Sequence, residues 1–301
     1  LGATAEIDQE IAHAHRRLLQ DGLHAWITLR HDPESGPAPF TVEALDPLQP
    51  SGDDLLARLR EGREAFSPGE WAYFLVRSVG LDPFEGALGP RGIGLALLRL
   101  VPLSERNYNF VELGPRGTGK SHLFGQLSSR AHLLSGGKAS VSKLFVHTGT
   151  GERGLVTSRD VVAFDEISST SFKGEESVSA LKDYMESGQA SRGKESVQGE
   201  ASIAFLGNID QVPRQLLKES HLFVSFPDRV EEDTALMDRI HAYLPGWEVP
   251  KIGPEGLGLT SGFLAECLHR LRRRSLKARV ARRAHLEGNL TGRDRNAVLK
   301  T

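Results

Sequence analysis

Residues 114–121 read Gly114-Pro115-Arg116-Gly117-Thr118-Gly119-Lys120-Ser121, which is the G-x-x-x-x-G-K-[ST] pattern of a phosphate-binding loop. The segment YNFVEL at 108–113 has the composition of a short strand, and residues 120–134 carry leucines at helical spacing. Glycines let backbone N–H groups close around a polyphosphate, and a helix N-terminus attracts anions. The stretch therefore predicts strand, nucleotide-binding loop and helix; a Gly-rich turn arising by chance is the alternative.

The loop residues have distinct expected contacts. Lys120 is expected to reach the β- and γ-phosphates of ATP, and the Ser121 hydroxyl to bind Mg²⁺. His122 follows this serine and is interpreted as a helix-face residue rather than a metal ligand. The predicted nucleotide-binding positions are Gly114, Gly117, Thr118, Gly119, Lys120, Ser121 and His122.

A second motif, VVAFDE at 161–166, is an apolar run that ends in two acids. Such a run is typical of a strand buried in a parallel sheet, whose carboxyl end faces the ligand. Asp165 is expected to hold Mg²⁺, and Glu166 to act as the general base toward water. The alternative is a core strand that happens to end in an acidic turn.

Two further positions complete the predicted site. The apolar run ASIAFL at 201–206 leads to Asn208, whose amide can orient the attacking water, unless it only caps a turn. Arg239 follows in LMDRI at 236–240, which is predicted as a short amphipathic helix. It is a candidate finger for the nucleotide of a neighbouring subunit. A solvated or ion-paired arginine is the alternative.

These segments resemble one protein family. FVELGPRGTGKSHLF, VVAFDEI, FLGNIDQ, LMDRIHAYLPGWEVPK and GNLTGRD are similar to the BrxL family, the Lon-related AAA+ ATPases of bacterial BREX phage-exclusion systems, from about Phe66 onward. The resemblance implies a ring-shaped, hexameric homo-oligomer, DNA binding, and other BREX components as partners. It also implies Walker A Lys120 and Ser121, Walker B Asp165 and Glu166, sensor 1 Asn208, arginine finger Arg239, and sensor 2 Arg293 with Arg295 as its rival.

The chain differs from the family at both ends. It begins at Leu1 rather than Met, so an N-terminal piece is expected to be absent. It stops at Thr301 inside a predicted helix, where the family continues into a Lon-protease-like domain. No serine–lysine pair has a context typical of a peptidase dyad, and no protease activity is expected from these residues.

Composition excludes several classes of protein. The chain has 301 residues, 39% hydrophobic content and a formal charge of −2, which suits globular material and not a basic DNA coat. A single cysteine, Cys267, excludes an intramolecular disulfide and a cysteine-based zinc cluster. There is no apolar run of about 18 to 20 residues and no signal-peptide layout, so a cytoplasmic protein without membrane contact is predicted.

The predicted fold class is α/β: an AAA+ P-loop NTPase with a parallel sheet and a helical lid, preceded by a small α+β domain. Residues 1–94 are assigned to that first domain, 95–258 to the ATPase core, and 259–301 to an apparently truncated lid. Within the first domain we expect a helix over 6–19, a strand over 23–29 and a Pro-rich loop over 32–50. Helices starting at 51–54 and 67–70 and a glycine-rich break at 86–94 follow.

Two basic features point to nucleic acid. The polar stretch 188–195 after a predicted helix at 178–187 is expected to form a hairpin, resembling the pre-sensor hairpin of replicative MCM helicases, with Arg192 and Lys194 near phosphates. Residues 270–283 hold eight Lys or Arg and no acid. The candidates there are Arg270, Arg273, Arg274 and Lys277, expected on one helix face. An exposed turn and a solvated helix face are the alternatives.

The sequence thus predicts an ATP-hydrolysing ring that encircles duplex DNA without sequence specificity, in anti-phage defence. One rival is a protein unfoldase feeding a Lon-like protease. Unfoldases grip polypeptide with an aromatic loop, and the corresponding interval Thr148 to Arg159 contains no aromatic residue, which favours DNA. A second rival is a nucleotide-gated scaffold that binds DNA without moving along it.

Overall fold

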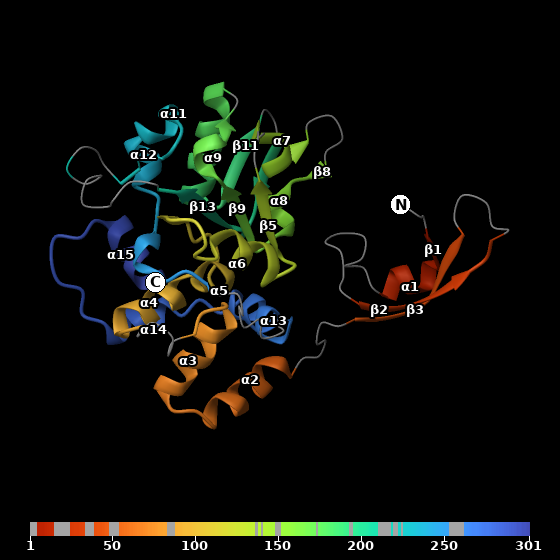
Figure 1. Cartoon of the computed structure of the whole chain (residues 1–301). Coiled ribbons are helices and arrows are strands. Elements are labelled where there is room, and N and C mark those ends of the chain that lie inside the picture. The colour runs from red at the N-terminus through yellow and green to blue at the C-terminus, as the bar shows by residue number, and fades with distance from the viewer. Residues whose placement is uncertain are drawn as a thin grey trace.

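The elements that position the predicted site lie in a central sheet with helices on both faces (Figure 1). The structure is a computed structural model of the chain. It describes residues 5–14, 25–33, 39–47, 54–82, 88–135, 138–139, 141–147, 152–172, 174–192, 195–209, 218, 222–223, 225–252 and 262–301.

The N-terminal part contains a three-stranded sheet of order β1-β3-β2, followed by two helices. Strand β1 is parallel to β3, and β2 is antiparallel to it. Helix α3 starts with the predicted capping box, in which Ser67 and Glu70 exchange hydrogen bonds. The bounds are β1 (Ala5–Ile7), α1 (Gln9–Ala14), β2 (Ala25–His31), β3 (Phe40–Pro47), α2 (Leu55–Glu64) and α3 (Pro68–Ser78).

Three predictions in this part were wrong. The Pro-rich loop over 32–50 contains strand β3, because the prolines flank the run FTVEAL and its Val42 and Leu45 are buried. The helix predicted over 6–19 starts as strand β1 and becomes helical at Gln9, since residues 5–7 pair with β3. The glycine-rich break at 86–94 includes the first turns of helix α4, which starts at Pro90.

The central sheet has five parallel strands in the order β14-β4-β13-β9-β5. Successive side chains of each strand point to opposite faces of the sheet, and each face packs into its own apolar cluster. Helix α9 lies on one face, and α3, α4 and α13 lie on the other (Figure 1). The strands are β4 (Phe110–Gly114), β5 (Ala131–Ser135), β9 (Val161–Asp165), β13 (Ser202–Asn208) and β14 (Ala242–Pro245). The predicted α/β class with a parallel sheet is confirmed.

One prediction inside this core was wrong. The helix expected over 120–134 ends at Gln126 as α6, and residues 131–135 form strand β5, parallel to β9. Leu134 suited the helical spacing, but a short apolar run is compatible with either structure. Residues 131–135 form a strand because they pair with β9, which is 30 residues further along the chain.

The remaining elements surround this sheet. They are α4 (Pro90–Leu98), α5 (Val101–Ser104), α6 (Lys120–Gln126), β6 (Lys138–Ala139), α7 (Val141–Leu144), β7 (Val146–His147), β8 (Glu152–Arg153), α8 (Leu155–Ser158), η2 (Ile167–Ser169), β10 (Ser171–Phe172), α9 (Gly174–Ser187), β11 (Gln189–Arg192), β12 (Glu195–Gln198), α11 (Asp228–Glu231), α12 (Thr234–Met237), η3 (Gly246–Glu248), α13 (Gly262–Leu271), α14 (Lys277–Arg283) and α15 (Gly292–Lys300).

The described part of the predicted lid, residues 262–301, contains the three helices α13, α14 and α15. The prediction that the basic residues of 270–283 share one helix face was wrong, because α13 ends at Leu271 and α14 begins at Lys277. The domain boundaries at 94 and 258 stay predictions, and α4 runs across the first. Within the described ranges, none of the helices reaches the length and apolar character that a membrane crossing requires.

Candidate active site

The phosphate-binding loop lies between the fully buried strand β4 and helix α6. Gly117 and Gly119 have φ angles of 87° and 78°, the left-handed region that favours glycine. A Cβ added to Gly114 would come within 2.5 Å of the backbone carbon of Gly246, so strand β4 and η3 approach closely there. The predicted order of strand, loop and helix is confirmed, with a shorter helix that ends at Gln126.

Lys120 lies inside the curve of this loop. Its Nζ donates to the carbonyl oxygens of Gly114 at 3.0 Å and Pro115 at 2.7 Å. Burial lowers the pKa of Lys120, while the nearby charges of Glu112 and Asp165 oppose that shift. The ammonium group is therefore positioned among backbone oxygens, beside the glycines that would cradle a phosphate.

Ser121 and Asp165 meet at the carboxyl end of the sheet. The Ser121 hydroxyl donates to Asp165 Oδ1 at 2.8 Å, although 44 residues separate the two. The same oxygen accepts the backbone N–H of Glu166 at 3.1 Å. A hydroxyl and a carboxylate at this distance are the oxygen donors that Mg²⁺ prefers, so these residues fit the ion.

Glu166 turns away from the strand at this point. Its φ of 50° and ψ of 57° lie in the left-handed region, which is uncommon for a residue with a side chain. Such conformations cluster at functional sites, where the surrounding structure enforces them. The side chain is exposed, next to the Ser121–Asp165 contact.

Asn208 lies beside the loop in the next strand. It is the last residue of β13 and is in register with Gly114, the last residue of β4. Ile209 N–H donates to the Gly114 carbonyl at 3.2 Å, which fixes the two strand ends together. Because β13 separates β4 from β9, the structure brings Asn208 between the loop and Asp165.

Arg239 lies at the opposite end of the sheet. It follows α12 and precedes β14, and its carbonyl accepts a 2.8 Å hydrogen bond from the side chain of Asn109 at the start of β4. The five residue-to-residue steps from Asn109 to Gly114 span about 16 Å of extended chain. Arg239 is therefore not brought together with Lys120 of the same chain.

Arg293 joins Arg239 at this end. Its Nη2 donates to Glu186 Oε2 at 2.6 Å, and Arg239 Nε lies 2.9 Å from the same oxygen. The Arg239 contact lacks hydrogen-bond alignment, so it is an ion pair. Arg293 Nη1 also contacts Asp238. Both arginines lie together, at the far edge from their own phosphate-binding loop.

Comparisons with known proteins agree with this geometry. A family model described as "Lon-like protease BrxL-like, ATPase domain" matches residues 40–301. The chain belongs to this BrxL-like ATPase domain family. It is 42% identical to a "Lon-like protease BrxL" of Bacillus cereus (strain H3081.97) over 95% of its length. It is 39% identical to a protein of the same name from Escherichia coli O9:H4 (strain HS) over 99% of its length. The chain spans 43% of the length of each relative.

The basic residues proposed for nucleic acid belong to a hairpin and to the C-terminal part of this BrxL-like domain. Arg192 is in β11, which pairs antiparallel with β12, so the predicted hairpin is confirmed. The other candidate in this stretch, Lys194, lies outside the described residues. Arg273, Arg274 and Lys277 are exposed, whereas Arg270 contacts Glu266 at 3.4 Å.

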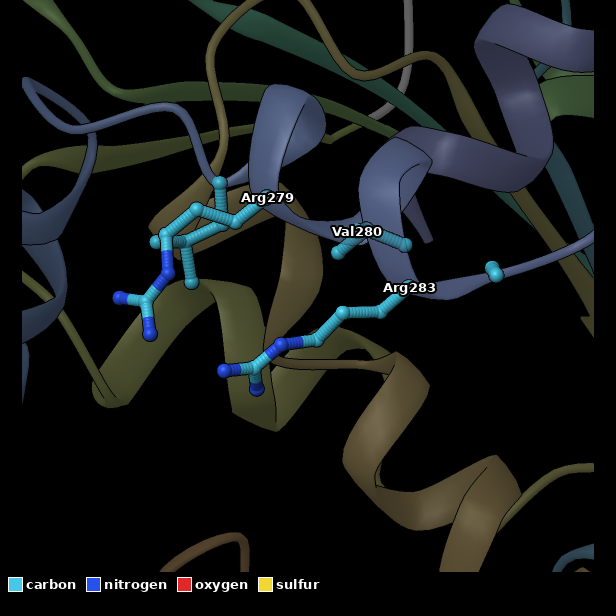
Figure 2. A pocket seen from close by; sticks show the side chains of 5 residues that line it. Arg279, Val280 and Arg283 are labelled. Atoms are coloured by element: carbon cyan, nitrogen blue, oxygen red, sulfur yellow. The ribbon is translucent and has the colours of Figure 1, made fainter.

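Helix α14 adds basic residues that sequence reasoning did not single out. Figure 2 shows Arg279 and Arg283 extending to the same side, with Val280 between them. These side chains line a shallow hollow together with Leu276 and Ala284. The signal in the sequence was the four-residue spacing of the two arginines, which places both on one face of a helix.

Three further contacts of the BrxL-like site were missed. The buried Glu112 and Arg99 form an ion pair below the loop, with Nε to Oε2 at 3.1 Å. Ile252 N–H donates to the Gly117 carbonyl at 2.9 Å and so places a distant segment against the loop. Glu186 binds both arginines. No local pattern marks these residues, because each contact joins segments far apart in the chain.

Proposed function

We propose that this chain binds and hydrolyses ATP in a homo-oligomeric ring, whose neighbouring copies complete each other's active sites, and that the ring binds DNA. The observation that carries the ATPase is the 2.8 Å hydrogen bond from Ser121 to Asp165. It joins the last part of the glycine loop to the acid-terminated strand, so that both face one nucleotide.

Each side chain then has a definite task. Ser121 and Asp165 would hold Mg²⁺, which when bound with ATP neutralises charge on the β- and γ-phosphates. Lys120 would exchange its loop carbonyls for phosphate oxygens. Glu166 would take a proton from water as the water oxygen bonds to the γ-phosphorus and the bond to the departing ADP oxygen breaks. Asn208 would orient that water.

The arginines would act on a neighbouring copy. Arg239 is separated from its own loop by the length of β4, about 16 Å, which is more than an arginine side chain extends. It can serve as a finger only across an interface between subunits. Arg293 is held at the same edge, so the sensor 2 role carried over from the family would also be exercised in trans. Arg295 remains its rival.

DNA binding rests on the hairpin and on the basic C-terminal helices. Arg192 belongs to the hairpin, and Arg273, Arg274 and Lys277 are exposed, while the whole chain carries a formal charge of only −2. Lys194 stays a candidate from the sequence. Contacts to phosphates would bind duplex DNA without reading its sequence. We further propose a hexameric ring that acts in anti-phage defence with other BREX components, which membership of the BrxL-like ATPase domain family supports, and a cytoplasmic location.

The rival function is a protein unfoldase, which the name "Lon-like protease" of the relatives favours. The test is the ATPase rate of the purified chain with duplex DNA, with an unfolded protein, and with both. Stimulation by DNA supports the proposal, and stimulation by the unfolded protein alone would overturn it in favour of the unfoldase. Stable binding to DNA with no change in rate supports the scaffold instead.

Two variants test the assignment of the active site. Lys120→Ala is expected to weaken ATP binding, since it removes a phosphate contact. Glu166→Gln is expected to retain binding and to stop hydrolysis, since it removes only the base. If Glu166→Gln hydrolysed ATP at the parent rate, Glu166 would not be the base.

A mixing experiment tests the shared site. Arg239→Ala is expected to abolish hydrolysis and to leave the nucleotide affinity of the isolated subunit unchanged. Mixing it with Lys120→Ala should restore activity, because some interfaces then pair an intact loop with an intact finger. Oligomers would be verified by sedimentation. Failure of every mixing ratio would show that Arg239 does not act across the interface.

A further inference from the structure

One carboxylate binds both candidate trans arginines. Glu186 is in the last turn of α9, and its Oε2 lies 2.9 Å from Arg239 Nε and 2.6 Å from Arg293 Nη2. Its Oε1 accepts from Arg293 Nε at 3.3 Å, so the Arg293 contact is bidentate. The three residues come from three elements that are 53 and 54 residues apart in sequence.

Each arginine has a second anchor on the same turn. Arg293 Nη1 donates to Asp238, and Arg239 Nη1 donates to the Ala235 carbonyl of α12. Arg239 is 16% exposed and Arg293 is 45% exposed. A guanidinium group has five N–H donors in a fixed plane, so one that is bound along its Nε edge keeps donors for a phosphate.

The charges around Arg239 and Arg293 favour binding of an anionic group. A cavity of about 330 Å³ lies here, and the cations Arg239, Arg293 and Lys277 that line it outnumber the carboxylates of Glu186 and Asp238. His241 also lines it, and burial lowers the pKa of this histidine to about 3, so it is neutral near pH 7. An anionic group of a neighbouring copy would meet net positive charge.

We propose that Glu186 is a positioning residue, which holds Arg239 and Arg293 as one unit for the nucleotide of the adjacent subunit. This inference rests on the proposed function, since it assumes that the arginines act in trans. Free arginine side chains lose about 2 kcal/mol of rotamer entropy when they are fixed. Glu186 fixes both before the interface forms, and it ties the lid helix α15 to the turn after α12.

The test is Glu186→Gln, which keeps the shape of the side chain and removes its charge. The kcat for ATP is expected to fall by roughly tenfold to a hundredfold, because catalytic groups misplaced by about 1 Å lose that much. The KM for ATP should change by less than about threefold, since the subunit's own loop is untouched. Glu186→Asp should recover part of the rate.

Glu176→Gln is the matched control, because Glu176 is exposed in the first turn of the same helix. It is expected to have the parent kcat. Sedimentation and thermal melting of all variants would verify that the rings form. An unchanged kcat for Glu186→Gln, or an equal loss in Glu176→Gln, would overturn the proposal.

Mixing with Lys120→Ala separates this proposal from the function on which it rests. If Glu186 acts through arginines in trans, the Lys120→Ala subunits supply intact arginine pairs, and activity of Glu186→Gln is restored. If Arg239→Ala is rescued in this way and Glu186→Gln is not, the positioning role is wrong and the trans finger stands. If Arg239→Ala itself is not rescued, the shared site is wrong, and the proposal for Glu186 is wrong with it.

Discussion

Glu112→Gln would test the buried ion pair that lies below the phosphate-binding loop. Glu112 is in the middle of β4, and Arg99 follows α4; their side chains are 0% and 1% exposed. Arg99 donates to the carboxylate from both Nε and Nη2. Glutamine keeps the shape and one oxygen acceptor but removes the negative charge. The Arg99 cation would then stay buried without a counter-charge.

The expected cost follows from this burial. Removing one partner of a buried ion pair costs about 3 to 5 kcal/mol, because the remaining charge cannot be hydrated. Since glutamine still accepts one hydrogen bond from Arg99, we expect a loss of about 3 kcal/mol in the free energy of unfolding. Replacing both residues, as Glu112→Leu with Arg99→Met, leaves no unpaired charge and is expected to cost less than the single change.

Urea unfolding followed by tryptophan fluorescence measures this, with extrapolation to water. The chain has three tryptophans. A loss below about 1 kcal/mol for Glu112→Gln would refute the reasoning, since that is the range of an ordinary surface ion pair. A double variant less stable than the single variant would also contradict it.

Glu112→Gln should also lower the pKa of Lys120. Burial lowers the pKa of this lysine, and Glu112 is the largest of the charges that oppose the shift. Without Glu112 the pKa falls further, so the ammonium form is lost at a lower pH. ATP affinity of Glu112→Gln, titrated from about pH 7 to about pH 10, should therefore decline earlier than that of the parent. Identical pH profiles would show that Glu112 does not support the charge of Lys120.

Three other perturbations have defined outcomes. Arg192→Ala with Lys194→Ala should weaken binding equally to unrelated DNA sequences and flatten log K against log salt by about 0.9 per lost phosphate contact on duplex; unchanged slope and affinity would exclude the hairpin. Gly119→Ala forces a side chain into φ 78° and places Cβ 2.0 Å from Ile252 Cδ1, so ATP affinity should fall by about tenfold or more in an equilibrium titration. Burial lowers the pKa of His241 from 6.5 to about 3, so the unfolded chain takes up a proton on this histidine before the folded chain does. The free energy of unfolding, measured in urea titrations, should therefore fall by about 2 kcal/mol between about pH 7 and about pH 5. His241→Asn should lack this pH dependence of stability.

The sequence was most informative where chemistry and secondary structure share one short segment. The glycine loop, the VVAFDE strand and the strand that ends at Asn208 each combine a buried apolar run with a polar residue at its end. Parallel strands carry such ends to the same edge, so the proximity of Asn208 to Gly114 followed from the pattern. The hairpin before β13 was predictable for a similar reason, since glycine-punctuated polar residues favour a turn.

The errors have a common physical cause. Residues 131–135 and 40–47 have ambiguous or proline-flanked patterns, and each became a strand through pairing with a partner distant in sequence. Glu186 and Glu112 were not recognised because a single acid in a helix or strand has no pattern, and their meaning comes from Arg293, Arg239 and Arg99. Local preference cannot specify contacts of this range.

The strand pair β4–β14 connects two halves of the proposed chemistry. At its carboxyl end, Gly114 packs against Gly246, and the segment after η3 reaches Gly117 through the N–H of Ile252. At its amino end, the side chain of Asn109 binds the carbonyl of Arg239. The two strands are parallel and paired over four residue pairs. One strand pair therefore holds the phosphate-binding loop at one end and the backbone of Arg239 at the other, so the rigid sheet fixes the distance between a subunit's own loop and the arginine proposed for its neighbour.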